Sequence, residues 1–160
     1  MSGDTEIIEK SAWREAMRVV QDTIEKLLER ERARTRPARV LIVDDNPDDV
    51  CFLCRDLNHF MVDVDVCHDS VEATRMVELK KYDFVFLDQK MPKFSGLDIL
   101  RKTTPGCSET QFFIVSGFPD SKIAGEALQL GALFVPKPLT DEERQRFRRL
   151  LSTFLKPRHA

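Results

Sequence analysis

The chain has 160 residues, a formal net charge of −2 and a hydrophobic content of 42%. This length corresponds to one domain with an appendage, and the near-neutral charge gives no whole-chain electrostatic reason to bind nucleic acid or an acidic membrane. No apolar run is long enough to span a bilayer and the first residues lack the features of a signal peptide, so we expect a cytoplasmic protein.

The first segment, residues 5–34, favours one long helix because it contains no Gly or Pro and is rich in Glu, Arg, Ala and Leu. Its apolar residues alternate in steps of four and three, as at the a and d positions of a coiled coil: Trp13, Met17, Val20, Ile24 and Leu27. The pattern lasts for only about two heptads. Two interpretations therefore remain open: a helix that associates with a partner or a second copy of the chain, which we favour, and a helix that lies against its own domain.

A linker is expected after this helix. Pro37 cannot continue a helix, so the basic stretch before Ala38 separates two parts of the chain. We divide the sequence into an N-terminal helical extension with its linker, residues 1–38, and a second domain, residues 39–160.

The second domain alternates apolar strands with helices. The predicted strands cover residues 40–43, 61–67, 83–87, 111–115 and 133–135. Predicted helices begin near residues 46, 69, 96, 120 and 140. This order predicts an α/β fold, a five-stranded doubly wound parallel sheet preceded by the long helix, with the first strand near the middle.

Two of these helix starts have clear sequence signals. Asn46 and Pro47 suit the cap and the first position of a helix. Thr140 and Glu143 have the spacing of a capping box, which we expect to open the last helix.

Polar residues follow the strands at their carboxyl ends. Asp44 and Asp45 follow the first strand, Asp88 the third, Ser116 the fourth and Lys137 the fifth. Ligands bind at this edge of a parallel sheet, and three neighbouring acids repel one another unless they hold a hard cation. With a lysine and a hydroxyl beside them, these groups suit phosphoryl transfer to a carboxylate with Mg²⁺.

Taken together, four motifs resemble the receiver domain of two-component response regulators. The resemblance covers about residues 39–155, and it implies the flavodoxin-like receiver fold. Each motif alone is common, but all four occur in order and each lies at a strand end. They are Asp44-Asp45, Asp88-Gln-Lys-Met91-Pro92, Ser116-Gly117 and Lys137-Pro138.

The resemblance implies that Asp88 is the phosphoacceptor, which takes a phosphoryl group from the phosphohistidine of a histidine kinase. Asp45 and Asp88 would bind Mg²⁺ directly, together with the backbone carbonyl of Lys90. Asp44 would hold the ion through water.

It also implies a switch. Ser116 would hydrogen-bond a phosphoryl oxygen, Lys137 would pair with the phosphate and with Asp88, and Phe134 matches the aromatic residue that turns inward. We therefore expect a signalling protein rather than an enzyme. Its expected partners are a histidine kinase or phosphotransfer protein, a downstream protein and a second copy of itself.

Three other functions are compatible with parts of this pattern. A degenerate receiver would serve as an unphosphorylated scaffold or dimerisation module. A DNA-binding regulator is disfavoured because no helix-turn-helix pattern is present. A phosphoaspartate phosphatase would carry a second acid two residues after its nucleophile, where this chain has Lys90.

Two features depart from the usual receiver pattern. The stretch from Gly131 to Lys137 is one residue shorter than is typical of the family, and Pro136 precedes the lysine. We expect the fifth strand to be remodelled, with more effect on Phe134 than on Lys137. In the family that the chain resembles, the position of Lys90 is variable and influences how water reaches the acyl phosphate.

The pair Cys51 and Cys54 has the spacing of a redox or metal site. Both residues lie inside a predicted helix, whose buried face we expect them to share, whereas a redox pair begins at a helix N-terminus. We therefore favour a structural role.

Overall fold

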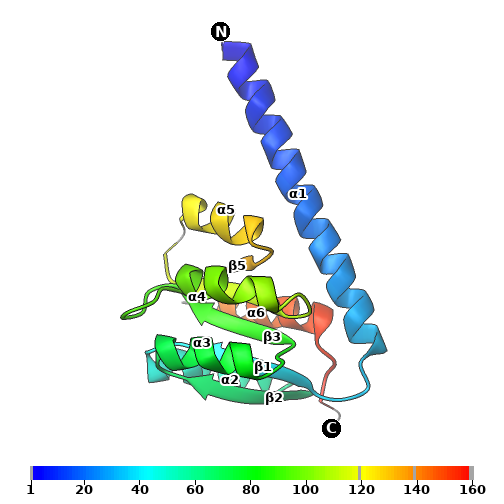
Figure 1. Cartoon of the computed structure of the whole chain (residues 1–160). Helices are drawn as coiled ribbons and strands as arrows, with labels where there is room; N and C mark the ends of the chain where they lie inside the picture. The colour runs from blue at the N-terminus through cyan, green and yellow to red at the C-terminus, as the bar shows by residue number, and fades with distance from the viewer. Residues whose placement is uncertain (1, 119, 139, 159–160) are drawn as a thin grey trace.

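The computed structural model describes residues 2–118, 120–138 and 140–158, with side chains described from residue 10 onward. Within these residues one long helix precedes five strands and their connecting helices (Figure 1). In chain order the elements are α1 (Ser2–Ala33), β1 (Ala38–Val43), α2 (Pro47–Leu57), β2 (Val62–Cys67), α3 (Ser70–Leu79), β3 (Phe84–Asp88), α4 (Gly96–Thr103), the short 3-10 helix η1 (Thr104–Gly106), β4 (Gln111–Ser116), α5 (Ser121–Gln129), β5 (Leu133–Pro136) and α6 (Asp141–Phe154).

The strands form one parallel sheet in the order β2-β1-β3-β4-β5. Helices α2 and α6 pack on one face of it, and α3, α4 and α5 pack on the other. The predicted doubly wound α/β fold is confirmed. From β1 the chain goes to β2 on one side and then to β3 on the other, so the strand order reverses between β1 and β3. Sheets of this type bind their ligands at that point.

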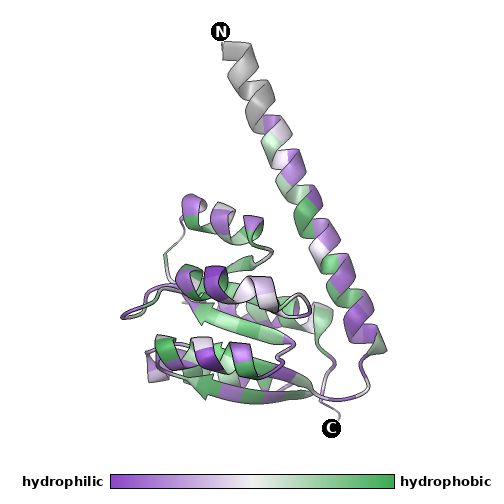
Figure 2. Cartoon of the chain, viewed as in Figure 1, coloured by the Kyte–Doolittle hydropathy of each residue, from purple (hydrophilic) through white to green (hydrophobic). Residues whose placement is uncertain are grey.

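The central strands are apolar on both faces because helices cover both sides of the sheet. Along β3, Phe84 and Phe86 belong to one core cluster, and Val85 and Leu87 belong to the other. Figure 2 shows the strands as a mainly hydrophobic layer between helices of mixed colour. The ring of Phe86 stacks on that of Phe113, with 4.7 Å between their centroids. Strand β3, which ends in Asp88, is therefore packed on both faces along its length.

Side-chain caps locate the helices that flank the carboxyl edge of the sheet. The Asn46 side chain accepts a hydrogen bond from the backbone nitrogen of Asp48 at 3.0 Å, and Pro47 is the first residue of α2. Thr140 and Glu143 form the predicted capping box of α6. Each cap contributes about 1 kcal/mol to stability. Both helices begin where these sequence signals predicted.

The shortened connection before Lys137 does not disrupt β5, so the expectation that this strand is remodelled was wrong. Gly131 takes a left-handed conformation with φ of 83°, which ends the turn after α5. Strand β5 then pairs with β4 in register as far as Pro136, opposite Ser116. A proline is tolerated there because β5 is an edge strand. The backbone nitrogen of Lys137 still donates to the carbonyl of Ser116, at 2.7 Å.

The C-terminal half of α1 packs against the domain. Leu27 is only 3% exposed and joins the core cluster that contains Phe147, Leu151 and Phe154 of α6. This part of the helix therefore follows the interpretation that we did not favour from the sequence. The division of the chain at residue 38 stays a prediction.

An ionic network reinforces this docking at the start of β3. The carboxylate of Asp83 pairs with Arg34 and Arg36 and accepts a hydrogen bond from the backbone nitrogen of Arg39 at 2.7 Å. Glu31, also buried, pairs with Arg34. Burial by itself raises the pKa of Asp83, but the hydrogen bonds from Arg36, Arg34 and Arg39 hold it well below its usual value. The charged network thus ties α1 to the sheet.

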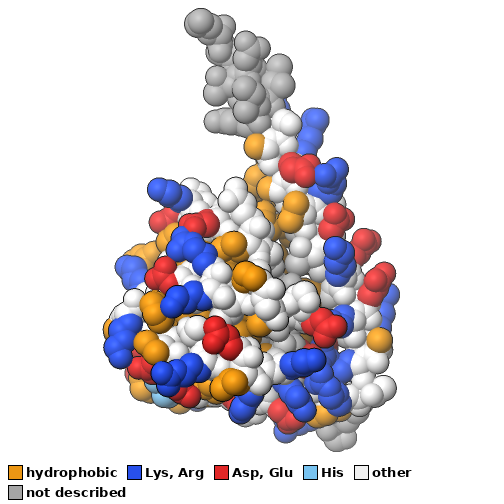
Figure 3. Space-filling view, viewed as in Figure 1, with side chains coloured by type: hydrophobic (Ala, Val, Ile, Leu, Met, Phe, Trp, Pro, Cys, Tyr) orange, Lys and Arg blue, Asp and Glu red, His pale blue; other side chains and the backbone are white. Residues whose placement is uncertain are grey.

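The N-terminal half of α1 extends away from the domain (Figure 1). Trp13 is 68% exposed and Met17 is 41% exposed, whereas Val20 and Ile24 are half-buried. Hydrophobic side chains are visible along this part of the helix in Figure 3. The predicted seam is thus divided between the domain and the solvent. None of the described helices is long and apolar enough to cross a membrane.

We predict that Leu27→Ala lowers the free energy of unfolding by about 2–4 kcal/mol, because it leaves a cavity between α1 and α6. Leu79→Ala is the matched control, since Leu79 is 85% exposed and its truncation should change stability by less than about 0.5 kcal/mol. Chemical denaturation of both variants tests this. Equal stabilities would show that α1 does not pack on its own domain in solution.

Candidate functional site

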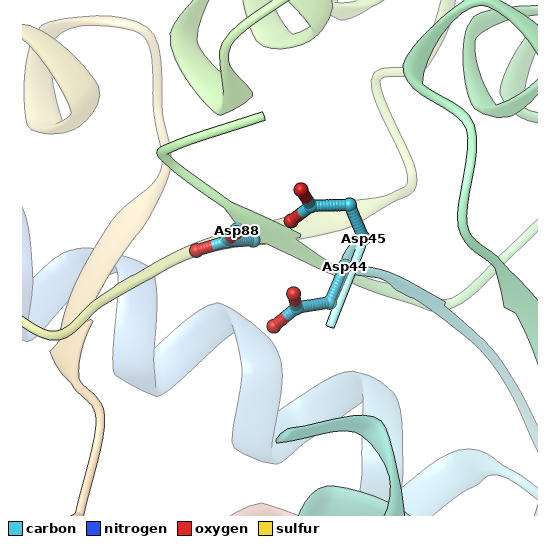
Figure 4. Close-up of side chains that lie close together, drawn as sticks. All are labelled: Asp44, Asp45 and Asp88. Atoms are coloured by element: carbon cyan, nitrogen blue, oxygen red, sulfur yellow. The ribbon is translucent and has the colours of Figure 1, made fainter. Parts of the chain in front are cut away.

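Three carboxylates meet at the carboxyl edge of the sheet. Asp44 and Asp88 are buried and Asp45 is exposed, and one oxygen from each lies within 4.8 Å of the others. Figure 4 shows the three side chains directed to the same side. In the part of the chain that the structure describes, they form the only group of three or more Asp, Glu, His or Cys side chains close enough to share an ion.

The backbone of β1 and β3 brings these acids together. Val43 and Leu87 are paired in register, so Asp44 and Asp88 follow on adjacent strands. Beyond β1, the carboxylate of Asp44 accepts a hydrogen bond from the backbone nitrogen of Asn46 at 2.9 Å, which turns the chain into α2. The placement predicted from the strand ends is what the structure shows.

Lys137 supplies the positive charge. Its Nζ lies 3.0 Å from Asp44 Oδ2, 3.1 Å from Asp88 Oδ1 and 2.8 Å from Asp49 Oδ2. Burial by itself lowers the pKa of Lys137, but hydrogen bonds to Asp49, Asp44 and Asp88 outweigh it and raise the pKa above its ordinary value. The lysine is therefore charged throughout the physiological range.

One ammonium does not balance the acids. Burial raises the pKa of Asp88 to about 6, and repulsion from Asp44 and Asp45 acts in the same direction, while Lys137 opposes it. The charged form of Asp88 is thus destabilised first by burial and then by the negative charge of its neighbours. Aspartate oxygens this close together are the donors that Mg²⁺ prefers, so the side chains present fit such an ion.

Ser116 and Phe134, the two other residues of the predicted switch, form no hydrogen bond with the three acids in the described part of the chain. Ser116 is buried, and its hydroxyl donates to the carbonyl of Phe118 at 3.2 Å and accepts from the Phe118 nitrogen at 3.3 Å. Phe134 is half-buried and packs against the core beneath α5. Phe118 is 66% exposed, and the Nζ of Lys90 lies 4.3 Å from the centroid of its ring. Ser116, Lys90, Lys137 and Asp88 all line one cleft.

Comparison with known families agrees with this geometry. A model described as the response regulator receiver domain matches residues 40–147. This chain belongs to that family. Receiver domains act in two-component signalling, bind Mg²⁺ at an acidic pocket and interact with histidine kinases and downstream partners.

Individual relatives are distant. The sensor protein EvgS of Escherichia coli (strain K12) is 29% identical over 119 residues, which is 74% of this chain and 10% of that protein. The response regulator MprA of Mycobacterium bovis (strain BCG) is 29% identical over 123 residues, or 76% of this chain and 54% of MprA. This receiver chain thus spans about half of MprA and a small part of EvgS.

Among solved structures, the CheX-CheY-BeF3-Mg²⁺ complex from Borrelia burgdorferi contains a similar chain. It superposes with a TM-score of 0.64 at 27% identity and covers 76% of this chain and 92% of that one. The receiver fold is therefore shared over about three quarters of this chain.

Gly96 is a site residue of this receiver domain that the sequence did not indicate. A Cβ atom at Gly96 would lie 2.7 Å from the backbone oxygen of Asp88 and 3.2 Å from Cδ1 of Ile114. Beside it, the side chain of Gln89 accepts a hydrogen bond from the backbone nitrogen of Leu97 at 3.1 Å. These contacts hold the end of β3 against α4, and they require a residue without a side chain at position 96.

The wall of the cleft was also missed. The cleft holds about 650 Å³, and α2 and α6 contribute Asp49, Phe52 and Arg144 to its lining. The guanidinium of Arg144 lies 4.6 Å from the ring centroid of Phe52, and Nη2 lies 3.9 Å from the buried carboxylate of Asp56. Because α2 and α6 are far apart in the sequence, no local pattern connects these side chains.

The cysteine pair is not part of the site. Cys54 is half-buried as expected, but Cys51 is exposed, so the prediction that they share one buried face was wrong. A spacing of three leaves the two residues only about 60° apart around α2, so they are neighbours on the helix surface, with Cys54 on its half-buried side and Cys51 on its solvent side.

We predict that Gly96→Ala destabilises the protein by about 1–3 kcal/mol, because the new methyl group forces the backbone of Asp88 to move. Gly125→Ala is a matched control: no atom lies within 4 Å of a Cβ there, and Gly125 is inside α5. That change should stabilise the protein by about 0.5–1 kcal/mol. Thermal unfolding distinguishes the two, and a neutral effect of Gly96→Ala would contradict the close approach.

Proposed function

We propose that this chain is a phosphoacceptor response regulator, which receives a phosphoryl group on Asp88 from a phosphohistidine and signals through protein contacts. The observation that supports this most directly is the position of Asp88. It lies at the end of β3, buried among two further aspartates, with the Nζ of Lys137 3.1 Å away. A scaffold without phosphorylation would not need this costly concentration of buried charge.

The proposed reaction is a transfer between two side chains. A carboxylate oxygen of Asp88 attacks the phosphorus atom, and the P–N bond of the phosphohistidine breaks. The bonding electrons stay with the imidazole nitrogen, which takes a proton from solvent, and Asp88 becomes an acyl phosphate. The chain is thus the acceptor in this reaction and not an enzyme with its own turnover.

Asp45 and Asp88 would bind Mg²⁺ directly, with the backbone carbonyl of Lys90, and Asp44 would hold it through water. When bound, the ion neutralises the oxygens of the transferred group. Lys137 would add its positive charge and pair with the phosphate.

The response to phosphorylation would involve Ser116 and Phe134. The Ser116 hydroxyl is engaged with the backbone of Phe118, so it must exchange these hydrogen bonds for one to a phosphoryl oxygen. Phe134 is half-buried, and its inward movement would be the second part of the response that the family resemblance implies. A histidine kinase or phosphotransfer protein is the proposed donor, and a downstream protein is the proposed target.

We predict that acetyl phosphate with Mg²⁺ adds one phosphoryl group to the chain, as detected by intact mass spectrometry. Asp88→Asn should abolish the modification because an amide is a poor nucleophile. Asp45→Ala and the omission of Mg²⁺ should each reduce it strongly, because the charge on the oxygens is no longer neutralised.

Asp63→Asn is the control for this experiment, since Asp63 is an exposed acid on the edge strand β2. Full modification of Asp88→Asn would show that another residue is the nucleophile. If neither acetyl phosphate nor a phosphorylated histidine protein modifies the wild type, the scaffold alternative is correct.

The same proposal includes a homodimer formed through α1. Trp13 and Met17 are exposed on the part of the helix that leaves the domain, and contiguous apolar surface of this kind marks interaction sites. Because Leu27 is used by the core of its own domain, the dimer seam is limited to residues 13–24.

We predict a dimer for the wild type in sedimentation experiments at micromolar concentration. Trp13→Ala combined with Met17→Ala should weaken the dimer at least about a hundredfold, because each buried apolar side chain contributes about 1.5–3 kcal/mol. Arg14→Ala, an exposed neighbour, is the control. A wild-type protein that is monomeric at high micromolar concentration, phosphorylated or not, would rule out the dimer. Point variants are preferable to removal of α1, which would also remove Leu27 and Arg34 from the domain.

A further inference from the structure

Asp49 holds the lysine of the site more closely than the other acids do. It lies in the first turn of α2, and its Oδ2 is 2.8 Å from Nζ of Lys137, against 3.0 Å for Asp44 and 3.1 Å for Asp88. An ammonium group has three N–H donors. Asp44, Asp49 and Asp88 therefore use all the donors that Lys137 has.

Asp49 also adds negative charge to the cleft without bringing a cation of its own. Among the described residues, every ion pair of Asp44, Asp49 and Asp88 is made with Lys137. The other two cations that line the cleft are engaged elsewhere. Lys90 lies over the ring of Phe118, and Arg144 lies against Phe52 and Asp56.

We infer that Asp49 is a positioning residue that limits how strongly the site holds a phosphoryl group. It does so in two ways: it competes with the phosphoryl oxygens for Lys137, and it keeps a carboxylate charge beside them. This inference rests on the proposed function of Asp88 and identifies an additional residue that tunes it.

The effect follows from the change in charge on phosphorylation. The phosphoryl group raises the negative charge at Asp88 from one unit toward two, while Asp49 stays within reach of the same ammonium. Removal of one negative charge at this separation, in a partly solvated cleft, corresponds to about a 3- to 10-fold change in affinity. A divalent cation responds in the opposite sense, because Asp49 attracts it.

The experiment measures two affinities by titration calorimetry on the full chain. The first is for Mg²⁺ alone, and the second is for beryllium fluoride at saturating Mg²⁺, a phosphoryl analogue that adds one negative charge to an aspartate. Asp49→Asn should bind beryllium fluoride about 3- to 10-fold more tightly and Mg²⁺ more weakly than wild type. Asp49→Glu keeps the charge and should stay close to wild type in both.

Asp48→Asn is the matched control. Asp48 has the same charge, lies in the same turn of α2, is exposed and forms no ion pair with the described residues. Its two affinities should change by less than about twofold, because an exposed charge is screened by solvent. Opposite shifts in Asp49→Asn alone support the inference, since a merely structural defect would weaken both ligands.

Three results would overturn it. Unchanged or weaker binding of beryllium fluoride by Asp49→Asn would show that Asp49 does not oppose the phosphoryl group. An equal gain in Asp48→Asn would assign the effect to net charge rather than to the contact with Lys137. A wild type that binds Mg²⁺ but no beryllium fluoride would overturn the proposed function itself, and the inference with it.

Discussion

The ion pairs of Lys137 are the interaction on which the site depends. One ammonium joins carboxylates from the end of β1, the first turn of α2 and the end of β3, two of which are buried. Without Lys137, these three carboxylates and that of Asp45 would repel one another, and burying them would oppose folding. Lys137 is itself placed by backbone pairing, because its nitrogen donates to the carbonyl of Ser116 at 2.7 Å. The register of the edge strand β5 thus determines where the positive charge of Lys137 lies among the acids of the site.

The loop between β3 and α4, which follows Asp88, depends on close backbone packing. The loop between β3 and α4 is held from the side of α3, where the Ser70 hydroxyl donates to the carbonyl of Pro92 at 2.7 Å and accepts from the nitrogen of Phe94 at 3.2 Å. Lys93, between them, has a φ of 69°, a conformation that non-glycine residues rarely adopt. Together with the contact of Gly96 against β3, these bonds keep the backbone around Asp88 in one arrangement.

The sequence was informative where the physics is local. Apolar runs that end in Asp44, Asp45 and Asp88 predicted both the sheet and its acidic edge, because parallel strands of one sheet share that edge. Contacts between distant segments were not predictable in the same way. Asp49 reads as an ordinary acidic residue at a helix start, and nothing nearby reveals that it meets Lys137. The seam of α1 shows the same limit: its spacing predicts an apolar stripe but does not indicate which part of it the domain covers.

The ionic anchor of α1 and the proposed phosphoacceptor, Asp88, lie at opposite ends of the short strand β3. Asp83 immediately precedes β3 and Asp88 ends it, so about 17 Å of hydrogen-bonded backbone separates the two charges. From Leu27, where the helix is held, to Trp13 is about 21 Å of rigid helix. Such a helix acts as a lever, and a tilt of about 5° at its base displaces the far indole by about 2 Å. A small change of angle at the base of α1 is therefore enlarged along the helix toward its exposed end.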